Sequence, residues 1–235
     1  MDLPKGQIDA DGAASGEISL DDVRAELADG ARVLLIVRHA ERPKIGYEDK
    51  SFGAALPLTP AGERMGEEFG RILRGAAQSV QFRASPLLRT VMTASLVARG
   101  MGIEGAEVVG DATIGNASAF VASELEMWEL FRDGGFFAKM REYMERGVQR
   151  GFAPLGAAAD AFEAHLLSLF TAQLGIFASH DVYVAAYLHA RGVKTDFCRE
   201  NWPRFMDSAA IILRPGEPRR YALVRAGLSD LCCGV

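Results

Sequence analysis

Apolar runs alternate with amphipathic stretches along this chain, which predicts a layered α/β fold. The five apolar residues 33–37 form an unbroken run that ends abruptly in Arg38-His39. Such a run is typical of a central strand covered on both faces, as in parallel sheets. A Pro-Gly-Glu-Pro segment between two late apolar runs predicts a hairpin. The predicted strands are residues 33–37, 80–84, 107–109, 175–179, 209–213 and 220–225.

Helix start signals follow most of these strands. Ser19 is a predicted N-cap of a helix that ends at Gly30, and Thr59-Pro60 begins a helix that runs to about Arg74. Ser85-Pro86 repeats the cap-then-proline signal for a helix to about Arg99, and residues 182–191 form another helix. Strands in alternation with helices predict a three-layer α/β/α fold with a mostly parallel central sheet.

The chain is predicted to form a single domain. Residues 1–17 are rich in Gly, Ala and Asp, which predicts a flexible N-terminal lead, and residues 18–235 form the domain. Residues 113–174 are helical in pattern, with breaks near Gly134-Gly135 and between Gly151 and Gly156. This stretch is too long for a simple crossover, so we expect a helical insertion over the active site.

Composition narrows the class of protein. The 235 residues carry a formal charge of -5, which disfavours a nucleic-acid partner. We expect no membrane span, because no apolar run reaches about 18 residues. The start of the chain lacks the order of a signal peptide. The three cysteines, Cys198, Cys232 and Cys233, have no zinc spacing, and together these features predict a cytoplasmic protein.

Three predicted strands end in reactive side chains. The first ends in Arg38-His39 with Arg42 just beyond, the second delivers Ser85 and Arg89, and the fourth ends in His180-Asp181. Ligands of open α/β sheets bind beyond the carboxyl ends of the strands, so we expect these groups to share one pocket.

Such a pocket suits a phosphate group. Guanidinium forks and helix N-termini bind tetrahedral oxyanions. A neutral histidine among them could attack phosphorus, and the arginines would neutralise charge in the transition state. Asp181 is then the candidate proton donor for the leaving oxygen.

The segment Arg38-His39-Ala40-Glu41-Arg42-Pro43 resembles the R-H-G-x-R-x-P signature of the histidine phosphatase (phosphoglycerate mutase-like) superfamily. The other motifs of that family follow in order, and the resemblance spans roughly residues 33–190. They are Leu58-Thr59-x-x-Gly62, Ser85-Pro86-Leu87-x-Arg89, Thr93-Ala94 and Ser179-His180-Asp181.

The resemblance implies roles for these residues. His39 would be the phosphorylated nucleophile, and Arg38, Arg89 and His180 would bind the phosphoryl group. Arg42 matches an additional arginine of the acid-phosphatase branch, which also takes its proton donor from the His-Asp motif, here Asp181. The chain departs from the signature in two places, because Ala40 replaces a glycine and Pro43 follows Arg42 directly.

Other residues have a structural and a functional interpretation. His165 and His189 lie in helical patterns without motif context, so a structural role is expected. Arg42 could pair with Glu41 or Glu48 instead of phosphate. Six aromatic residues of the insertion favour core packing, although one or two could line the substrate mouth. Those six are Phe120, Trp128, Phe131, Phe136, Phe137 and Tyr143.

Two further features complete the candidate site. Glu124 and Glu126 are rival proton donors, because the mutase branch uses a glutamate after its third strand, but a solvated helix face is the simpler interpretation. Asn201-Trp202-Pro203 suggests a loop near the site without an evident mechanism.

The sequence therefore predicts a phosphomonoester hydrolase that requires no metal and no cofactor. Its partner would be a small phosphorylated substrate or a phosphoprotein. A phosphomutase, or a catalytically silent module that binds phospho-ligands or proteins, remains the alternative. The natural substrate and the oligomeric state stay open.

Overall fold

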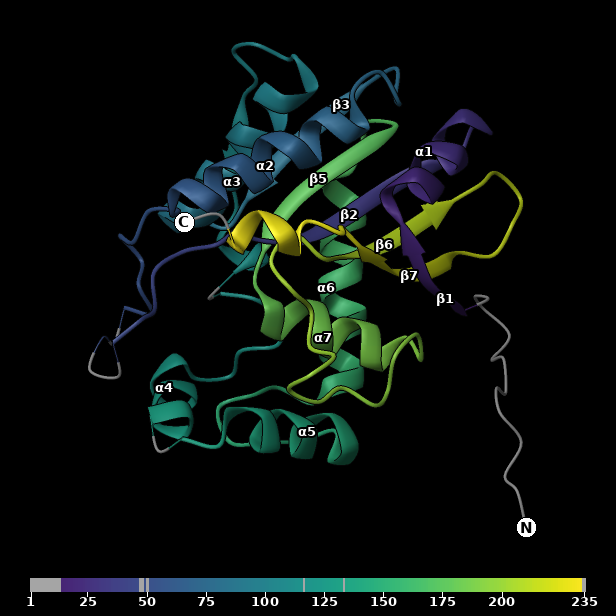
Figure 1. Cartoon of the computed structure of the whole chain (residues 1–235). Helices are drawn as coiled ribbons and strands as arrows, with labels where there is room; N and C mark the ends of the chain where they lie inside the picture. The colour runs from purple at the N-terminus through teal and green to yellow at the C-terminus, as the bar shows by residue number, and fades with distance from the viewer. Residues whose placement is uncertain (1–13, 47–48, 50, 116, 133, 234–235) are drawn as a thin grey trace.

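Seven strands form one sheet at the centre of a computed structural model of the protein (Figure 1). The structure describes residues 14–46, 49, 51–115, 117–132 and 134–233. The strands are β1 (Ala14–Ser19), β2 (Arg32–Arg38), β3 (Val80–Ala84), β4 (Val108–Gly110), β5 (Leu174–Ser179), β6 (Ser208–Leu213) and β7 (Arg220–Arg225). The helices are α1 (Leu20–Ala28), α2 (Pro60–Leu73), α3 (Leu88–Met101), α4 (Glu124–Arg132), α5 (Phe136–Arg146), α6 (Leu155–Leu169) and α7 (Asp181–Ala190), with 3₁₀ turns at Ala112–Ile114 and Ser229–Cys233.

The sheet is mostly parallel, which confirms the predicted fold class. Its strand order is β1-β7-β6-β2-β5-β3-β4, and only β6 runs against its two neighbours. The carboxyl ends of β2, β5 and β3 therefore lie side by side. This is the point where the chain crosses over β5 to reach β3, and ligand sites of open α/β sheets occur at such switch points.

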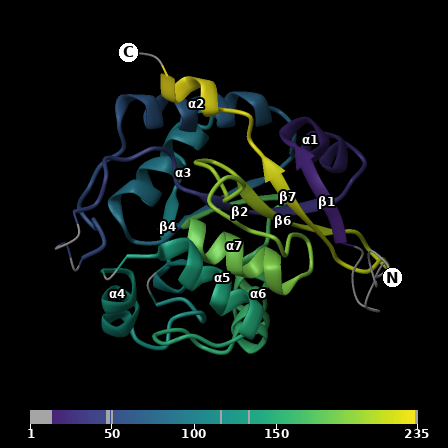
Figure 2. The same ribbon diagram turned by 60° about the horizontal axis from the view of Figure 1, so that its bottom comes forward.

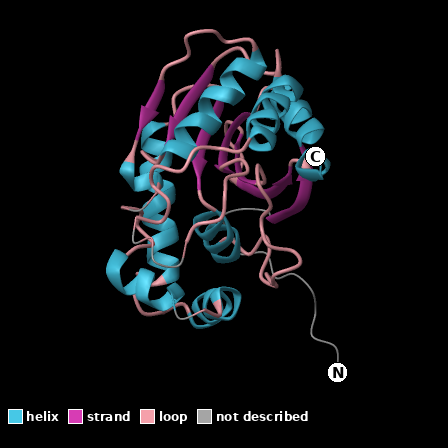
Figure 3. Cartoon of the chain, turned by 60° about the vertical axis from the view of Figure 1, so that its left-hand side comes forward, coloured by secondary structure: helices cyan, strands magenta, loops and turns pink. Residues whose placement is uncertain are grey.

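Helices cover both faces of the sheet, as Figures 2 and 3 show. Alternate residues of β2 separate the two layers: Val33, Leu35 and Val37 pack with α1, α2 and α3, whereas Leu34 and Ile36 pack with α6 and α7. All five are fully buried. This continuous burial explains why the strand has no polar alternation in its sequence.

The helical part added to the layered core is smaller than the predicted insertion of residues 113–174. Helix α6 belongs to the regular outer layer, because Phe162 and Leu166 pack in one cluster with Leu34 and Phe177 of the sheet. Helices α4 and α5 form the added part, and they lie at the edge of the molecule below α7 in Figure 1.

Two local predictions are corrected by the structure. Residues 14–17, predicted to belong to a flexible lead, are part of β1, which pairs with β7 and whose Glu17 binds Arg225. Residues 1–13 lie outside the described residues. Ser85 does not cap α3. The N-cap residue of α3 is Leu87, which makes no side-chain capping bond. The Ser85 hydroxyl instead contacts Thr90 and His180. Ser19 and Thr59 cap α1 and α2 as predicted.

No helix in the described part of the chain combines the length and apolar character that crossing a bilayer requires.

Candidate active site at the carboxyl ends of the central strands

His39 follows β2 and is held with one ring nitrogen bonded to the backbone. Its Nδ1 lies 2.8 Å from the carbonyl oxygen of Ala40. A carbonyl oxygen only accepts, so Nδ1 carries the proton and donates it. The other nitrogen, Nε2, therefore carries a lone pair. The His39 side chain is 98% buried and lines a cavity, so a nucleophilic nitrogen is available there.

The surroundings of His39 keep its ring neutral. Burial, the neighbouring His180 and the charges of Arg89 and Arg38 hold the pKa of His39 well below its ordinary value. A neutral imidazole is the nucleophilic form.

The substitution at Ala40 leaves this arrangement intact. The Ala40 amide donates to Oγ1 of Thr93 over 3.0 Å, and its methyl group packs with the apolar cluster beneath α2 and α3. Thr93 thus fixes the backbone turn after His39. The methyl group lies in this core cluster, and Ala40 is absent from the residues that line the cavity.

His180 follows β5 and faces His39, with the two ring centres 5.5 Å apart. Its Nε2 lies 3.0 Å from the Ser85 hydroxyl, and its Nδ1 is 3.5 Å from Nη2 of Arg89. Burial, followed by the charge of Arg89, lowers the pKa of His180 to about 3. Gly115 is required nearby, because a Cβ atom there would lie 2.5 Å from Cβ of Ser85.

Arg42 and Arg89 line the same cavity, and Arg38 lies at its edge beside Asp181. Among the described residues, none supplies a hydrogen-bond partner for the buried Nε atoms of Arg38, Arg42 and Arg89. Buried guanidinium nitrogens without partners are costly, and a bound oxyanion would satisfy them. Burial and then the charge of Arg42 lower the pKa of Arg89 to about 10, so this arginine remains charged at neutral pH.

The loop before α2 fixes two of these arginines. Nη1 of Arg89 donates to the carbonyl oxygen of Gly53 over 2.9 Å, and Nη1 of Arg42 donates to that of Pro43. Arg42 lines the cavity, whereas the carboxylate of Glu41 accepts from the Thr59 hydroxyl. The alternative partner, Glu48, lies outside the described residues.

Asp181 begins α7 and contacts two groups through one oxygen. Its Oδ2 lies 3.2 Å from Nη2 of Arg38 and accepts from the indole N–H of Trp202 over 3.1 Å. Burial favours the neutral acid, but Arg38, Trp202, His180 and Arg42 outweigh burial and hold the pKa of Asp181 below its ordinary value. In the free protein Asp181 is therefore a carboxylate.

Asn201-Trp202-Pro203 now has a clear place in the site. Besides the Trp202 contact to Asp181, the carbonyl oxygen of Pro203 accepts from Nη1 of Arg38 over 2.5 Å. Sequence reasoning missed Phe205, whose ring centre is 4.3 Å from the Arg38 guanidinium and 5.8 Å from the centre of the His39 ring.

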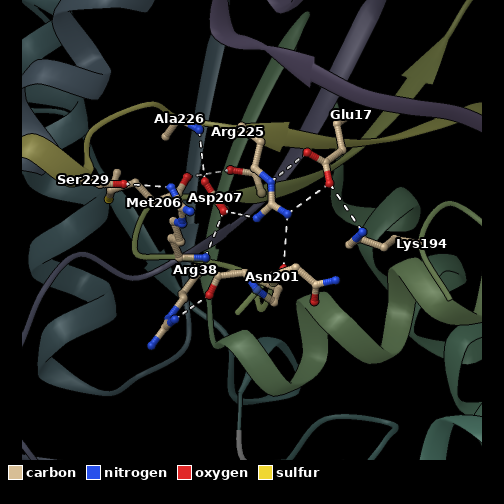
Figure 4. A network of polar contacts seen from close by, with 12 residues as sticks. Glu17, Arg38, Lys194, Asn201, Met206, Asp207, Arg225, Ala226 and Ser229 are labelled. Atoms are coloured by element: carbon tan, nitrogen blue, oxygen red, sulfur yellow. Dashed lines mark hydrogen bonds and ion pairs between the residues drawn. The ribbon is translucent and has the colours of Figure 1, made fainter. Parts of the chain in front are cut away.

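A buried acid behind the site anchors this loop. Asp207 accepts from Nη1 of Arg225 and from the backbone amides of Arg204 and Ala226, at 2.7 to 3.1 Å. Figure 4 shows Arg225 between Asp207 and Glu17, with Arg38 on the far side of Asp207. The backbone of Asp207 also accepts from the Arg38 amide over 2.9 Å. Nothing in the sequence pattern marks this network, because its members lie far apart in the chain.

The cavity has a volume of about 270 Å³ and lies beside these groups. His39, Arg42, Arg89, His180 and Asp181 line it, so the structure brings the predicted pocket residues together, with Arg38 contacting Asp181 at its edge.

The rival candidates lie elsewhere. Glu126 forms an ion pair with Arg150, Glu124 is exposed, and neither lines the cavity. His165 binds Asp111 over 2.8 Å, and neither it nor His189 lines the cavity. Of the six aromatic residues, Trp128, Phe131 and Phe136 line the cavity, Phe120 and Tyr143 are core residues, and Phe137 packs against Trp202 outside the cavity lining.

Comparisons with known proteins agree with the motifs. A family model of the histidine phosphatase superfamily (branch 1) matches residues 34–115. Because this model describes branch 1, closeness to the acid-phosphatase branch stays a prediction. No curated protein sequence matched the chain.

Solved structures of the same fold cover most of the chain. A mycobacterial glucosyl-3-phosphoglycerate phosphatase superposes with a TM-score of 0.54 at 17% identity, over 82% of this chain and 97% of that one. A phosphoglycerate mutase from Bacillus anthracis gives 0.52 at 13% identity, over 86% and 96%. A phosphoserine phosphatase from Entamoeba histolytica gives 0.52 at 15% identity, over 85% and 98%. These superpositions show that the chain has the phosphoglycerate mutase-like fold.

Proposed function

We propose that this member of the histidine phosphatase superfamily is a phosphomonoester hydrolase that works through a phosphohistidine on His39. One observation carries the proposal: the lone-pair nitrogen of a neutral, buried histidine shares a cavity with guanidinium groups whose buried Nε atoms have no partner among the described residues. A nucleophile surrounded by unsatisfied cationic donors suits a phosphoryl group.

The first half of the reaction transfers the phosphoryl group to the protein. Nε2 of His39 attacks phosphorus, a P–N bond forms, and the P–O bond to the alcohol breaks. Arg38, Arg42, Arg89 and His180 bind the phosphoryl oxygens and neutralise the charge that develops on them. The leaving oxygen takes its proton from Asp181.

Binding of substrate prepares Asp181 for this step. In the free protein Arg38 contacts its carboxylate and helps to lower its pKa. A phosphate dianion that engages Arg38 adds negative charge next to Asp181 and raises its pKa. Asp181 then carries a proton when the ester bond breaks.

The second half returns the protein to its starting state. Asp181, now a carboxylate, takes a proton from water as the water oxygen attacks phosphorus, and the P–N bond breaks. Inorganic phosphate leaves, and His39 regains its lone pair. Asp181 acts as acid and then as base, which balances the protons over the cycle.

Ser85 allows His180 to change its hydrogen-bonding role. In the free protein Nδ1 of His180 faces an Arg89 nitrogen, which only donates, so Nε2 donates to the Ser85 hydroxyl. When phosphate is bound, Nδ1 must donate to it instead. The hydroxyl of Ser85 then donates to Nε2, because a hydroxyl both accepts and donates.

The experiment measures phosphate release and the covalent intermediate together. The purified protein is mixed with an aryl phosphate, quenched, and analysed for inorganic phosphate and for phosphorylated His39 by mass spectrometry. We expect turnover by the wild type, and a loss of about 10³-fold or more in His39→Ala. The matched control is His165→Gln, because His165 does not line the cavity.

The other functions predict different outcomes. Transfer of the phosphoryl group to a second hydroxyl, with little free phosphate, would indicate a mutase. Binding of phosphate without turnover would indicate a silent phospho-ligand module. Near wild-type release by His39→Ala would refute the phosphohistidine mechanism.

A further inference from the structure

The wall of the cavity beyond the phosphate-binding groups is apolar and largely aromatic. Phe52 comes from the loop before α2, Met127, Trp128 and Phe131 come from α4, and Phe136 begins α5. Val182 of α7 adds an aliphatic side chain beside Asp181. These residues surround the space that the alcohol part of a phosphate ester would occupy.

Charged groups on this wall are few. Beyond the phosphate-binding groups and Asp181, Arg132 and Asp49 are the charged residues among the described ones that line the cavity. The Arg132 guanidinium lies 5.1 Å from the Trp128 ring centre. The Asp49 oxygens accept from Ser51 and Gly53. A polyol placed here would bury hydroxyl groups against the rings of Phe52, Phe131 and Phe136, which offer no hydrogen bonds, and this is unfavourable.

The backbone around Phe52 belongs to the loop that also contacts the phosphate-binding Arg89. Phe52 has a φ of 52°, a left-handed conformation that costs energy for a bulky residue. Asp49 bonds the amides on either side of it, and the next residue, Gly53, accepts from Arg89. The loop that binds Arg89 therefore also holds the strained backbone of Phe52 and places the Phe52 ring at the cavity.

We infer that the substrate is a small phosphate monoester whose alcohol part is an aromatic or aryl-alkyl group. This inference rests on the proposed function and adds the substrate class. The aromatic wall would pack against the ring of the alcohol, while the arginines bind its phosphoryl group. Polyhydroxylated or polyanionic alcohols, such as sugars and hydroxy acids, would be poor substrates.

The experiment compares three esters of primary alcohols: 2-phenylethyl phosphate, ethyl phosphate and glycerol 1-phosphate. All three leaving groups are primary alcohols, so differences in kcat/KM report binding of the alcohol part. We expect 2-phenylethyl phosphate to exceed ethyl phosphate by at least about tenfold, as apolar pockets discriminate by such factors. Glycerol 1-phosphate should be no better than ethyl phosphate. A preference for glycerol 1-phosphate, or equal rates for all three, would overturn the inference.

Variants of the wall residues test whether the aromatic wall causes the preference for 2-phenylethyl phosphate. Trp128→Ala should lower kcat/KM for 2-phenylethyl phosphate by about tenfold or more and change ethyl phosphate by about twofold at most. Phe52→Leu, a milder change, should show the same pattern if Trp128→Ala folds poorly. The matched control is Leu125→Ala on the same helix, because Leu125 is 60% exposed and does not line the cavity. Equal losses for both substrates would contradict a role of the wall in selectivity.

A binding measurement separates this inference from the proposed function. If no ester is hydrolysed, the proposed function fails, and calorimetry with 2-phenylethylphosphonate and ethylphosphonate still tests the wall. Binding of the phenylethyl compound about tenfold more tightly would support the inference, whereas equal affinities would overturn it.

Discussion

The indole N–H of Trp202 donates to Oδ2 of Asp181 over 3.1 Å, and the same oxygen lies 3.2 Å from Arg38. This pairing joins the loop before β6 to the start of α7. It holds the carboxyl group beside Arg38 at the wall of the cavity. A position of this kind suits a proton donor, and its surroundings set how strongly it holds the proton.

The first prediction concerns the leaving group. Asp181→Asn removes the proposed acid, so hydrolysis of an alkyl phosphate should fall by about 10² to 10⁴. An aryl phosphate should be affected much less, because a phenolate leaves with little protonation. Steady-state rates with one substrate of each type measure the difference.

Glu124→Gln and Glu126→Gln serve as controls for this prediction, because neither glutamate lines the cavity. If one of them, and not Asp181→Asn, shows the leaving-group-dependent loss, the acid is wrongly assigned and the mutase-like alternative gains support.

A second prediction tests the Trp202 contact. Trp202→Phe removes one of the groups that lower the pKa of Asp181 and keeps a ring to pack against Phe136 and Phe137. Because the pKa of Asp181 rises in this variant, the acid stays protonated to higher pH. The alkaline limb of kcat for an alkyl phosphate should therefore move to higher pH. A pH profile measures the limb, and a move to lower pH would show that Trp202 does not stabilise the carboxylate.

The central part of the site was predictable because its signals are local. A buried strand that ends in Arg38-His39, and another that ends in His180-Asp181, are visible as apolar runs stopped by charge. The carboxyl ends of parallel strands lie at one edge, so the convergence follows from the fold class. The helix caps at Ser19 and Thr59 are local signals of the same kind.

The rest depends on contacts between distant segments. Strand β1 forms because its backbone pairs with β7, about two hundred residues away, and its own sequence has no strand pattern. Ser85 has the residue type of a cap, but His180 and Thr90 engage its hydroxyl in the folded state. Phe205 contacts Arg38 from a loop next to Asp207, which is bound to the distant Arg225.

A third prediction follows from the lowered pKa of His180. This pKa is about 3 in the folded protein and about 6.5 in an unfolded chain. Between these values the unfolded state binds an extra proton, so stability falls as pH decreases from about 6.5 toward 3. The slope reaches about 1.4 kcal/mol per pH unit for this group. His180→Gln removes the group, so its free energy of unfolding should depend less steeply on pH in this range.

Urea unfolding at a series of pH values measures the slope. His165→Gln is the control, since His165 is partly exposed and lies outside the cavity. An equal slope in wild type and His180→Gln would show that His180 binds its proton in the folded state as readily as in the unfolded state.

A fourth prediction concerns metal ions. Excess chelator should leave phosphatase activity unchanged, because the charge-neutralising role is assigned to Arg38, Arg42, Arg89 and His180. Activity is measured without chelator, with chelator, and again after divalent ions are added to the chelated sample. Loss of activity that only a divalent ion restores would show that a cation supplies the charge neutralisation instead.

The last prediction concerns the anchor behind the site. Arg225→Met leaves the carboxylate of Asp207, which is 98% buried, without its cationic partner, so the protein should lose about 1 to 3 kcal/mol of stability. Since Asp207 holds the loop that carries Trp202 and Pro203, kcat should also fall, and more for alkyl than for aryl phosphates, while KM changes little. Arg225→Lys should restore part of the rate.

Arg146→Met is the matched control, because Arg146 is 70% exposed in an ion pair with Glu142 on the surface. Rates are compared per folded molecule, at a temperature well below the midpoint of unfolding of every variant. If Arg225→Met is destabilised but keeps the wild-type kcat and the wild-type ratio of alkyl to aryl rates, the Asp207–Arg225 pair stabilises the fold without positioning Arg38 and Asp181. A loss that is selective for alkyl phosphates would instead trace the effect to Asp181 through Trp202.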